Sequence, residues 1–389
     1  DFTLMEHVTG ASYTIPPTQF RMYIAVNVRG VGDTEGLLKA GTSRIGLGSQ
    51  TVSTPEPPED IFTPPVFDPE NVPVLTLNLV QQSRVSTLID EGYIPIANVG
   101  DLQAINNSSQ LHSFAANTAF ETITQPSIYG KYVLVNDIDF SGRTYFSAFV
   151  NLFGGVLDGN FFAFKNLNAT PFNSFGVFGS TNSQPGDPET GVTFRNLTIE
   201  NFTIAQQGTS FPWNPLSVGG LIARSGGPVN LENIQVNQIS LTGINIAGGL
   251  IGNVDGRLNV SQVSIDGDIT SPRRSGGLIG QYSGISSITL NEVANHANVF
   301  AEEYAGGMFG GIMSGATHTF NNVYNSGLIA SSSTSEASLG GLVGLLSGDA
   351  NNLSFELTNA YNGGAIIGGA EQGSIIGESR NIDNQITFA

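Results

Sequence analysis

The chain has 389 residues, of which 32 are acidic and 14 basic, so its net charge is −18, and it contains no cysteine. This negative charge argues against nucleic-acid binding and against adsorption to anionic membranes. The lack of cysteine excludes disulfides, thiolate metal sites and cysteine nucleophiles. No segment reaches the roughly 18 apolar residues of a membrane-spanning helix.

The first part of the chain predicts a small β-rich region followed by an arm. Residues 1–53 contain one clear β-forming run at 21–28 and a weaker one at 43–47. Residues 54–73 hold seven prolines, a composition typical of an extended, semi-rigid segment. We interpret this stretch as a linker or as an arm that lies on another surface.

A lead-in or cap is expected over residues 74–128. The alternation of apolar residues in Val74–Val80 predicts a strand. A short helix is predicted from Val99 to Ile105, with Asn98 as its N-cap and Asp101 near the positive end of the helix dipole.

Two sequence blocks recur in alternation over residues 129–389. The first is a Gly-Gly-Leu-Ile-Gly block whose copies are spaced by 29, 28, 30 and 34 residues. Its glycine pairs are Gly219 and Gly220, Gly248 and Gly249, Gly276 and Gly277, Gly306 and Gly307, and Gly340 and Gly341. The second has two apolar residues around a polar pair, and its asparagines include Asn196, Asn233, Asn322 and Asn359, with Gln262 and Glu292 as departures.

This repetition predicts a parallel β-helix. A unit of about 29 residues cannot bury its own core, so each copy must pack on its neighbours. The apolar pairs are β-formers without helical periodicity, so each copy should be one coil of strands. About seven coils at about 4.8 Å each would give a body of roughly 35 Å. The glycines would allow coils to approach closely, and the asparagine column would form a hydrogen-bonded ladder where the coil turns.

The repeat resembles the GLUG repeat of bacterial surface and secreted proteins. The segments Tyr132–Phe140 and Gly155–Gly159 are similar to the lead-in of such proteins, and the resemblance covers about residues 93–389. It implies an extracellular or cell-surface location. It implies no single activity, because the repeat occurs both in adhesin stalks and beside protease domains.

Histidine and carboxylate patterns give little support for catalysis. The four histidines form no His-Glu-x-x-His zinc motif, and His296 and His318 are expected on separate surface turns. Asp137 and Asp139 flank one isoleucine, and Asp266 and Asp268 flank one glycine. Either pair could hold calcium or act as acid and base, but turn capping is the favoured interpretation. No catalytic residue, resident metal or cofactor is expected.

Aromatic residues offer a second kind of candidate. Six phenylalanines between residues 161 and 178 are expected to plug the end of the solenoid. Trp213, in an insertion from 205 to 217, is the candidate ligand-binding residue, because insertions emerge as surface loops.

Three functions remain open. The first is a non-enzymatic extracellular solenoid, structural or adhesive, that assembles with other protein subunits and binds glycans without inserting into a membrane. The second is a virion tail or head fibre that binds host glycans. The third is a polysaccharide-degrading β-helix enzyme, which needs two carboxylates about 5–10 Å apart beside a groove.

Overall fold

The computed structural model describes residues 12–13, 52–53, 79–107, 127–184, 189–208, 216–314, 316–348, 353–380 and 386–388. The chain divides into two units, Asp1–Phe67 and Asp68–Ala389. The described part of the first unit is an antiparallel pair, β1 (Ser12–Tyr13) and β2 (Val52–Ser53). The strands predicted at 21–28 and 43–47 and the proline-rich arm at 54–73 lie outside the described residues.

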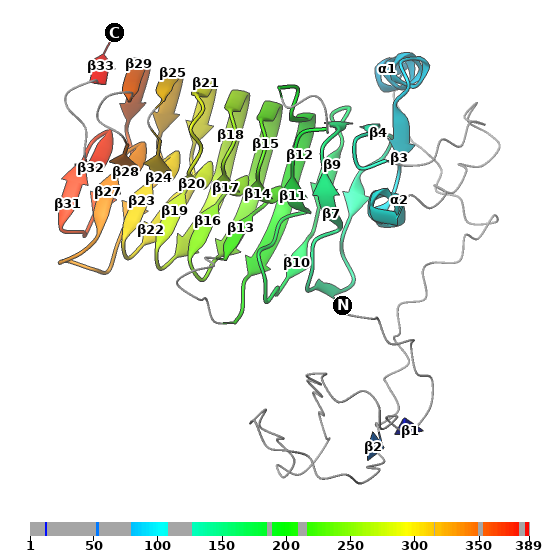
Figure 1. The fold of residues 1–389 in the computed structure, drawn as a ribbon, viewed down its shortest axis with the longest axis horizontal. Coiled ribbons are helices and arrows are strands. Elements are labelled where there is room, and N and C mark those ends of the chain that lie inside the picture. Colours follow the sequence, from blue (N-terminus) through cyan, green and yellow to red (C-terminus); the bar gives the residue numbers. More distant parts are fainter. Residues whose placement is uncertain are drawn as a thin grey trace, which may run out of the picture. The chain divides into compact units, whose positions relative to one another are not determined.

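The second unit is a parallel β-helix, as predicted (Figure 1). Its long sheet contains β3 (Ile94–Ile96), β4 (Lys131–Leu134), β5 (Ile138–Asp139), β6 (Thr144–Tyr145), β8 (Val156–Asp158), β9 (Ala163–Lys165), β10 (Asn168–Ala169), β12 (Val192–Ala205), β15 (Val229–Thr242), β18 (Leu258–Ser271), β21 (Ile288–Asn295), β22 (Asn298–Ala301), β25 (Thr317–Asn325), β26 (Ile329–Ala330), β29 (Ser354–Asn362), β30 (Ile366–Ile367) and β33 (Ile386–Phe388). A second sheet contains β7 (Val150–Phe153), β11 (Phe178–Thr181), β14 (Ile222–Ser225), β17 (Ile251–Val254), β20 (Ile279–Tyr282), β24 (Phe309–Met313), β28 (Val343–Ser347) and β32 (Ile376–Arg380). A third contains β13 (Ser217–Gly219), β16 (Ile246–Gly248), β19 (Arg274–Gly276), β23 (Tyr304–Gly306), β27 (Ser338–Gly340) and β31 (Glu371–Gly373).

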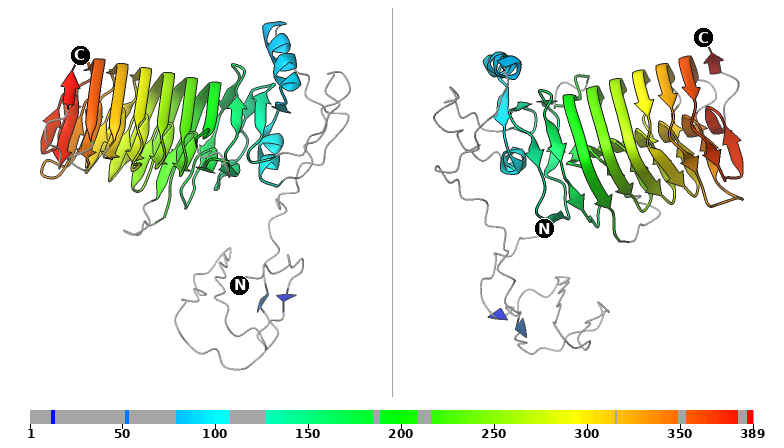
Figure 2. Two further views of the ribbon diagram at one scale, coloured as in Figure 1. Left: turned by 45° about the horizontal axis from the view of Figure 1, so that its top comes forward. Right: turned by 180° about the vertical axis from the view of Figure 1, so that it is seen from behind.

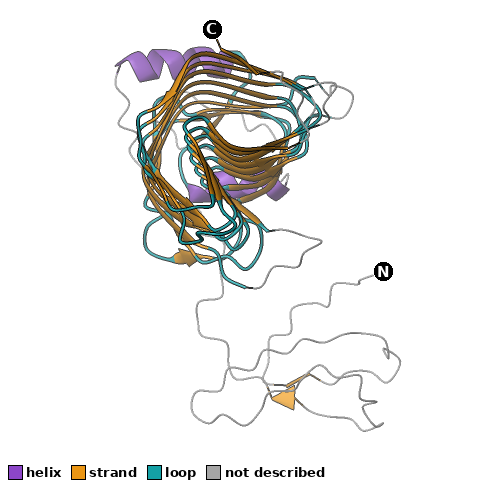
Figure 3. Ribbon diagram, turned by 90° about the vertical axis from the view of Figure 1, so that its left-hand side faces the viewer, coloured by secondary structure: helices purple, strands orange, loops and turns teal. Residues whose placement is uncertain are grey.

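The three sheets surround a main apolar core, and a smaller separate cluster that includes Ala305 and Leu339 lies beside the third sheet. Viewed along the axis, the strands of successive coils lie over one another (Figure 3). The eight-stranded second sheet receives one strand from each coil, which is close to the seven or so coils expected from the sequence. Residues that follow each other up a column, such as Leu231, Val260 and Leu290, pair in register and are almost completely buried.

The glycine pairs stand where the chain passes from the third sheet to the second. A Cβ on Gly248 would lie 2.0 Å from the Ile251 carbonyl oxygen, and a Cβ on Gly249 would lie 2.2 Å from the Gly277 carbonyl oxygen. Real Cβ atoms essentially never come this close to backbone atoms. The pair is therefore a steric requirement of coil stacking.

The asparagine column bends the long strands. Asn196, Asn233, Asn322 and Asn359 all have φ between 51° and 54°, a left-handed conformation that asparagine tolerates better than most residues. Asn233 donates to Asn196 over 3.0 Å, and Asn359 donates to Asn322 over 3.1 Å. Their side chains thus link neighbouring coils at the bend.

The helix α2 (Val99–Ala104) closes the core at the β3–β4 end of the solenoid, and the 3-10 turn Ile105–Asn107 continues it (Figure 2). Asn98 Oδ1 accepts from the Asp101 amide over 3.0 Å, and Asp101 Oδ2 accepts from the Ala97 amide over 2.9 Å. These bonds confirm the predicted helix start. Leu102 and Ile105 join the main core.

The phenylalanines do not form the expected plug. Within the cluster, Phe164, Phe175 and Phe178 are buried in the core, whereas Phe161 and Phe172 are more than half exposed. Because α2 already covers this end, the buried rings serve as ordinary core residues of the following coils.

The prediction of a strand over Val74–Val80 is wrong for its last two residues. Leu79 and Val80 begin the helix α1 (Leu79–Asp90), and the residues before them lie outside the described range. Val85 and Leu88 from α1 pack on Val133 and Val135 of the first coil. This tertiary contact favours a helix that the local pattern does not reveal. None of the helices in the described part of the chain is long and apolar enough to cross a membrane.

Candidate functional site

The two predicted aspartate pairs act mainly as turn and ladder groups. Asp137 forms an ion pair with Lys165 over 2.7 Å and accepts from the Ala163 amide over 2.8 Å. Asp139 accepts from the Ser141 amide over 2.9 Å, and this bond lowers the pKa of its carboxyl. The two carboxylates thus bind a lysine and backbone amides, and they do not face each other across a groove.

The second pair lies on an exposed stretch of β18. Asp268 accepts from the side-chain Nδ2 of Asn298 over 2.9 Å, and Asp266 is exposed. Gly267, between them, has φ of 138° at an irregularity in the pairing of β15 with β18. Within the described ranges, no three histidine or carboxylate side chains gather as metal ligands would. Calcium binding therefore stays a prediction.

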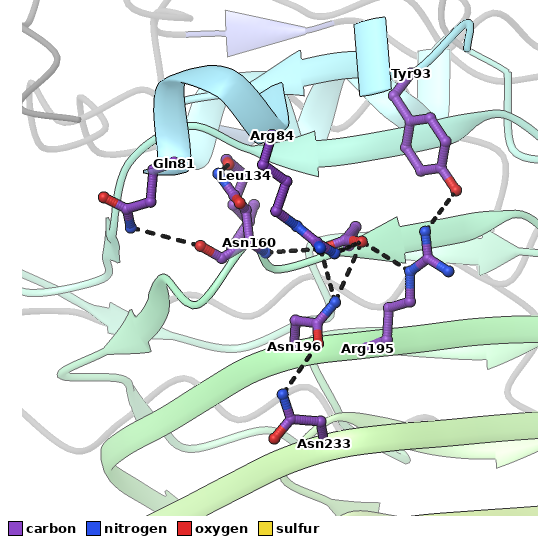
Figure 4. A network of polar contacts seen from close by, with 9 residues as sticks. Gln81, Arg84, Tyr93, Leu134, Asn160, Arg195, Asn196 and Asn233 are labelled. Carbon is purple, nitrogen blue, oxygen red and sulfur yellow. Dashed lines mark hydrogen bonds and ion pairs between the residues drawn. The ribbon is translucent and has the colours of Figure 1, made fainter. Parts of the chain in front are cut away.

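A buried group of charges surrounds Asp158, at the end of β8 (Figure 4). This carboxylate is fully buried and forms ion pairs with Arg84 from α1 over 2.6 Å and with Arg195 from β12 over 2.7 Å. It also accepts from the Asn196 side chain over 3.2 Å and from the Asn160 amide over 2.9 Å. Asp158 therefore joins the helix to two successive coils.

Tyr93 completes this group. Arg195 donates to the Tyr93 hydroxyl over 3.0 Å, and burial raises the pKa of that hydroxyl. Asp158 belongs to the segment Gly155–Gly159 that the sequence analysis singled out. Its neighbours in the sequence do not predict its partners, Arg84 and Arg195, because these lie far away in the chain.

A groove with a volume of about 460 Å³ lies beside these residues. Arg84 and Leu88 from α1 line it on one side, and Arg195 lines it on the other. Glu91 and Glu232 also line it. The two carboxylates counter the two guanidinium groups, which already bind Asp158. The arrangement suits a structural joint that fixes α1 better than a site for an anionic ligand.

A second surface group, the His–Tyr face, lies on the outside of the long sheet near its C-terminal coils. We define it as His296, Tyr324, Ser326 and Tyr361. Tyr324 and Tyr361 are register partners on β25 and β29, and their rings stack with centroids 5.5 Å apart and an interplanar angle of 11°. Tyr361 is 57% exposed. Stacked rings on adjacent rigid strands present a preorganised aromatic surface.

Histidine and serine give this face its polar groups. His296 Nδ1 lies 2.6 Å from Ser326 Oγ, and His296 Nε2 lies 3.2 Å from the Tyr324 hydroxyl. A serine hydrogen-bonded to a histidine supplies two of the three residues of a nucleophilic triad. Here a tyrosine occupies the second ring nitrogen, and within the described chain no carboxylate bonds this ring. The contacts therefore order the surface without the orienting carboxylate of a triad.

The prediction that His318 lies on a surface turn is wrong. It is fully buried in the core, where Nδ1 accepts from the Ile288 amide over 3.2 Å and Nε2 has no hydrogen-bond partner. Its ring packs edge-on against Tyr282 and Phe355. Burial lowers the pKa of His318 to about 4, so the side chain is neutral at physiological pH.

The candidate residue Trp213 lies outside the described residues. The sequence analysis did not predict the tyrosines of the His–Tyr face, because they stand beside the more regular asparagine column. Tyr324 and Tyr361 each follow that block directly. An aromatic residue recurring at one outward position of successive coils is the signal that could have identified this face.

Comparisons with known proteins add little to this picture. No family model matches the chain, and no curated protein matches it. Among solved structures, it is similar to one described as a "putative immunoglobulin A1 protease from Bacteroides ovatus". The two share 16% identity over 74% of this chain and 84% of that chain, with a TM-score of 0.49. This likeness is too weak to bear on function, so the GLUG resemblance and the expected lack of catalysis both stay predictions.

Proposed function

We propose that this chain is a non-enzymatic, extracellular adhesive solenoid that binds neutral glycans through the His–Tyr face. The observation that carries the proposal is the stacked Tyr324–Tyr361 pair on the outer surface of the long sheet, in which Tyr361 is exposed and the half-buried Tyr324 is hydrogen-bonded to His296. The solenoid behind it supplies a rigid frame, because β25, which carries Tyr324, is paired on one side with β21 and on the other with β29.

The chemistry of the face suits a sugar ring. Tyrosine has an apolar face and a polar tip, and its two side-chain torsions cost little entropy on binding. The face of Tyr361 that is not stacked on Tyr324 can pack on the C–H side of a pyranose, while Ser326, His296 and the nearby Asn322–Asn359 ladder offer groups for its hydroxyls. This is an apolar platform with polar groups at its edge.

Charge favours a neutral ligand. The chain has a net charge of −18, and the exposed residues Glu292 and Asp268 lie on the same outer sheet. Sulfated or uronic-acid polymers would be repelled by this field. Neutral hexose and N-acetylhexosamine units carry no such penalty.

A glycan array with the full chain tests the proposal. We expect binding to neutral glycans, and we expect His296→Ala combined with Tyr324→Ala to weaken it at least about tenfold, a loss of about 1.4 kcal/mol. Phe146→Ala is the matched control, since Phe146 is also an exposed aromatic residue, at 59%, but lies on an early coil. Absence of binding by the wild-type chain, or equal binding by the double variant, would refute the proposal.

The same samples distinguish an enzyme from a binding protein. A polysaccharide-degrading enzyme would release reducing ends from some polymer, and Asp137→Asn or Asp266→Asn would abolish that release. Such a result would replace the adhesive function. Release that persists in both variants would point to carboxylates other than these two.

A further inference from the structure

The groove between α1 and the long sheet is large enough for a small molecule. Its volume of about 460 Å³ falls within the range of roughly 300–1,000 Å³ that is common for small-molecule sites. One wall comes from α1, through Arg84 and Leu88, and from Glu91 just after the end of that helix. The other wall comes from β12 and β15, through Arg195 and Glu232. Each wall therefore offers one cation and one anion to a ligand.

The two guanidinium groups keep free donors after binding Asp158. Each guanidinium group has five N–H groups. Arg84 uses Nη2 for Asp158, and Arg195 uses Nε for Asp158 and Nη2 for the Tyr93 hydroxyl (Figure 4). In the described part of the chain, Nη1 of both arginines has no hydrogen-bond partner, and Arg84 Nε is buried without one. The two side chains are 33% and 30% exposed, so a ligand can reach them.

Charge at this end of the groove also favours one more carboxylate. The guanidinium groups of Arg84 and Arg195 and the carboxylate of Asp158 together carry one net positive charge. A single further carboxylate would neutralise it and would accept the unused N–H groups in charge-assisted bonds.

The two carboxylates of the groove, Glu91 and Glu232, are exposed. Within the described ranges, neither side chain forms an ion pair or a hydrogen bond. Glu232 is the register partner of Arg195, so about 4.8 Å separates their Cα atoms across the parallel strands. An ammonium group can therefore bind at the glutamates while a carboxylate of the same small molecule binds at the arginines.

The charges of the groove discriminate between classes of ligand. An anion alone would meet two carboxylates and the net charge of −18 of the chain, and a cation alone would meet two guanidinium groups. A neutral sugar would form hydrogen bonds but would supply no counter-charge to either pair. A zwitterion satisfies both signs and adds no net charge.

We propose that this groove binds a free α-amino acid. Its carboxylate accepts from Arg84 and Arg195, and its ammonium group donates to Glu91 and Glu232. Its side chain lies against Leu88, the apolar residue of the lining. The bound amino acid joins α1 to β12 and β15 and so strengthens the joint that the ion pairs already form.

Saturation-transfer NMR on the full chain, with each standard amino acid in turn, tests the proposal. We expect saturable binding of at least one of them. For that amino acid, the N-acetyl derivative lacks the ammonium group and the C-terminal amide lacks the carboxylate. We expect each derivative to bind at least about tenfold more weakly. No binding by any amino acid, or equal binding of either derivative, would overturn the proposal.

The variant Glu232→Gln locates the site, because Glu232 is exposed and its replacement leaves the ion pairs of Asp158 in place. We expect at least about fivefold weaker binding, since the ammonium group loses a charged acceptor. Glu356→Gln is the matched control, since Glu356 is exposed on β29 of the same sheet and should leave binding unchanged. Equal binding by Glu232→Gln would contradict the proposed site. A neutral sugar whose binding this variant weakened would replace the amino acid as the ligand.

Hydrogen exchange gives an independent measure of where the amino acid binds. The bound amino acid should slow exchange of the amides in α1 and leave those in β29 unchanged, because of these two only α1 borders the groove. Unchanged exchange in α1 would contradict binding at this groove. His296→Ala combined with Tyr324→Ala should retain amino-acid binding, so the outcome is separable from that of the glycan proposal.

Discussion

Protonation of His318 should destabilise the core on acidification. The folded protein holds this residue neutral, because burial lowers its pKa from 6.5 to about 4. The unfolded chain takes up a proton near pH 6.5, whereas the folded chain takes it up only near pH 4. Stability is therefore complete above about pH 6.5 and falls as the pH drops toward 4. At about 1.4 kcal/mol per pKa unit, the loss is about 3 kcal/mol.

Asp101 has the opposite effect over nearly the same range. Burial raises the pKa of its carboxyl from 3.8 to about 6. The folded chain therefore takes up this proton first, and stability rises as the pH falls from 6 toward 4. The opposite effects of His318 and Asp101 on the free energy of unfolding largely cancel in the wild-type chain. Together, these two groups should therefore change its stability little as the pH falls from 7 toward 4.

Urea unfolding at pH 7 and pH 4.5 separates these contributions. His318→Phe fills the site with an apolar ring of similar size, in a column that already contains Phe355. We expect this variant to gain about 2–3 kcal/mol relative to wild type on going from pH 7 to pH 4.5. His296→Phe, at an exposed position, is the matched control and should follow wild type. The same pH dependence in wild type and His318→Phe would show that protonation of His318 does not destabilise the fold.

Three further substitutions test the joints of the solenoid. Asp158→Ala leaves two arginines without their buried carboxylate, so we expect a loss of about 3–5 kcal/mol in urea unfolding, with faster hydrogen exchange in α1; unchanged exchange there would contradict the role of Asp158. Gly249→Ala places a methyl group 2.2 Å from a carbonyl oxygen and should lower the melting temperature far more than Gly363→Ala, where the nearest atom is 3.8 Å away; similar melting of both would argue against the steric role of the pair. Asn322→Val forces a β-branched residue into a left-handed conformation and should cost about 1–3 kcal/mol, whereas Asn322→Gly should melt close to wild type.

The repeat could be predicted because its requirements are local and recur in every coil. Gly249 has no room for a Cβ, and Asn233 adopts φ of 52°. Each such requirement leaves the same residue at the same place in successive copies. The register of the sheets and the fold class could therefore both be predicted from that repetition.

Features that depend on contacts distant in the chain could not be predicted. The helix α1 is stabilised where Val85 meets Val133, and the pattern of its own residues does not identify this face. His318 is polar by type, yet its column places it between Ile288 and Phe355 in the core. Asp158 has the sequence of a turn residue, and only the folded coils bring two arginines to it.

Binding of a neutral glycan to the His–Tyr face can be measured by calorimetric titration of the full chain with the best glycan from the array. We predict a saturable, stoichiometric complex that His296→Ala combined with Tyr324→Ala weakens at least about tenfold and that Phe146→Ala leaves unchanged. Wild-type affinity in the double variant would contradict binding at this face and place any glycan site elsewhere on the molecule.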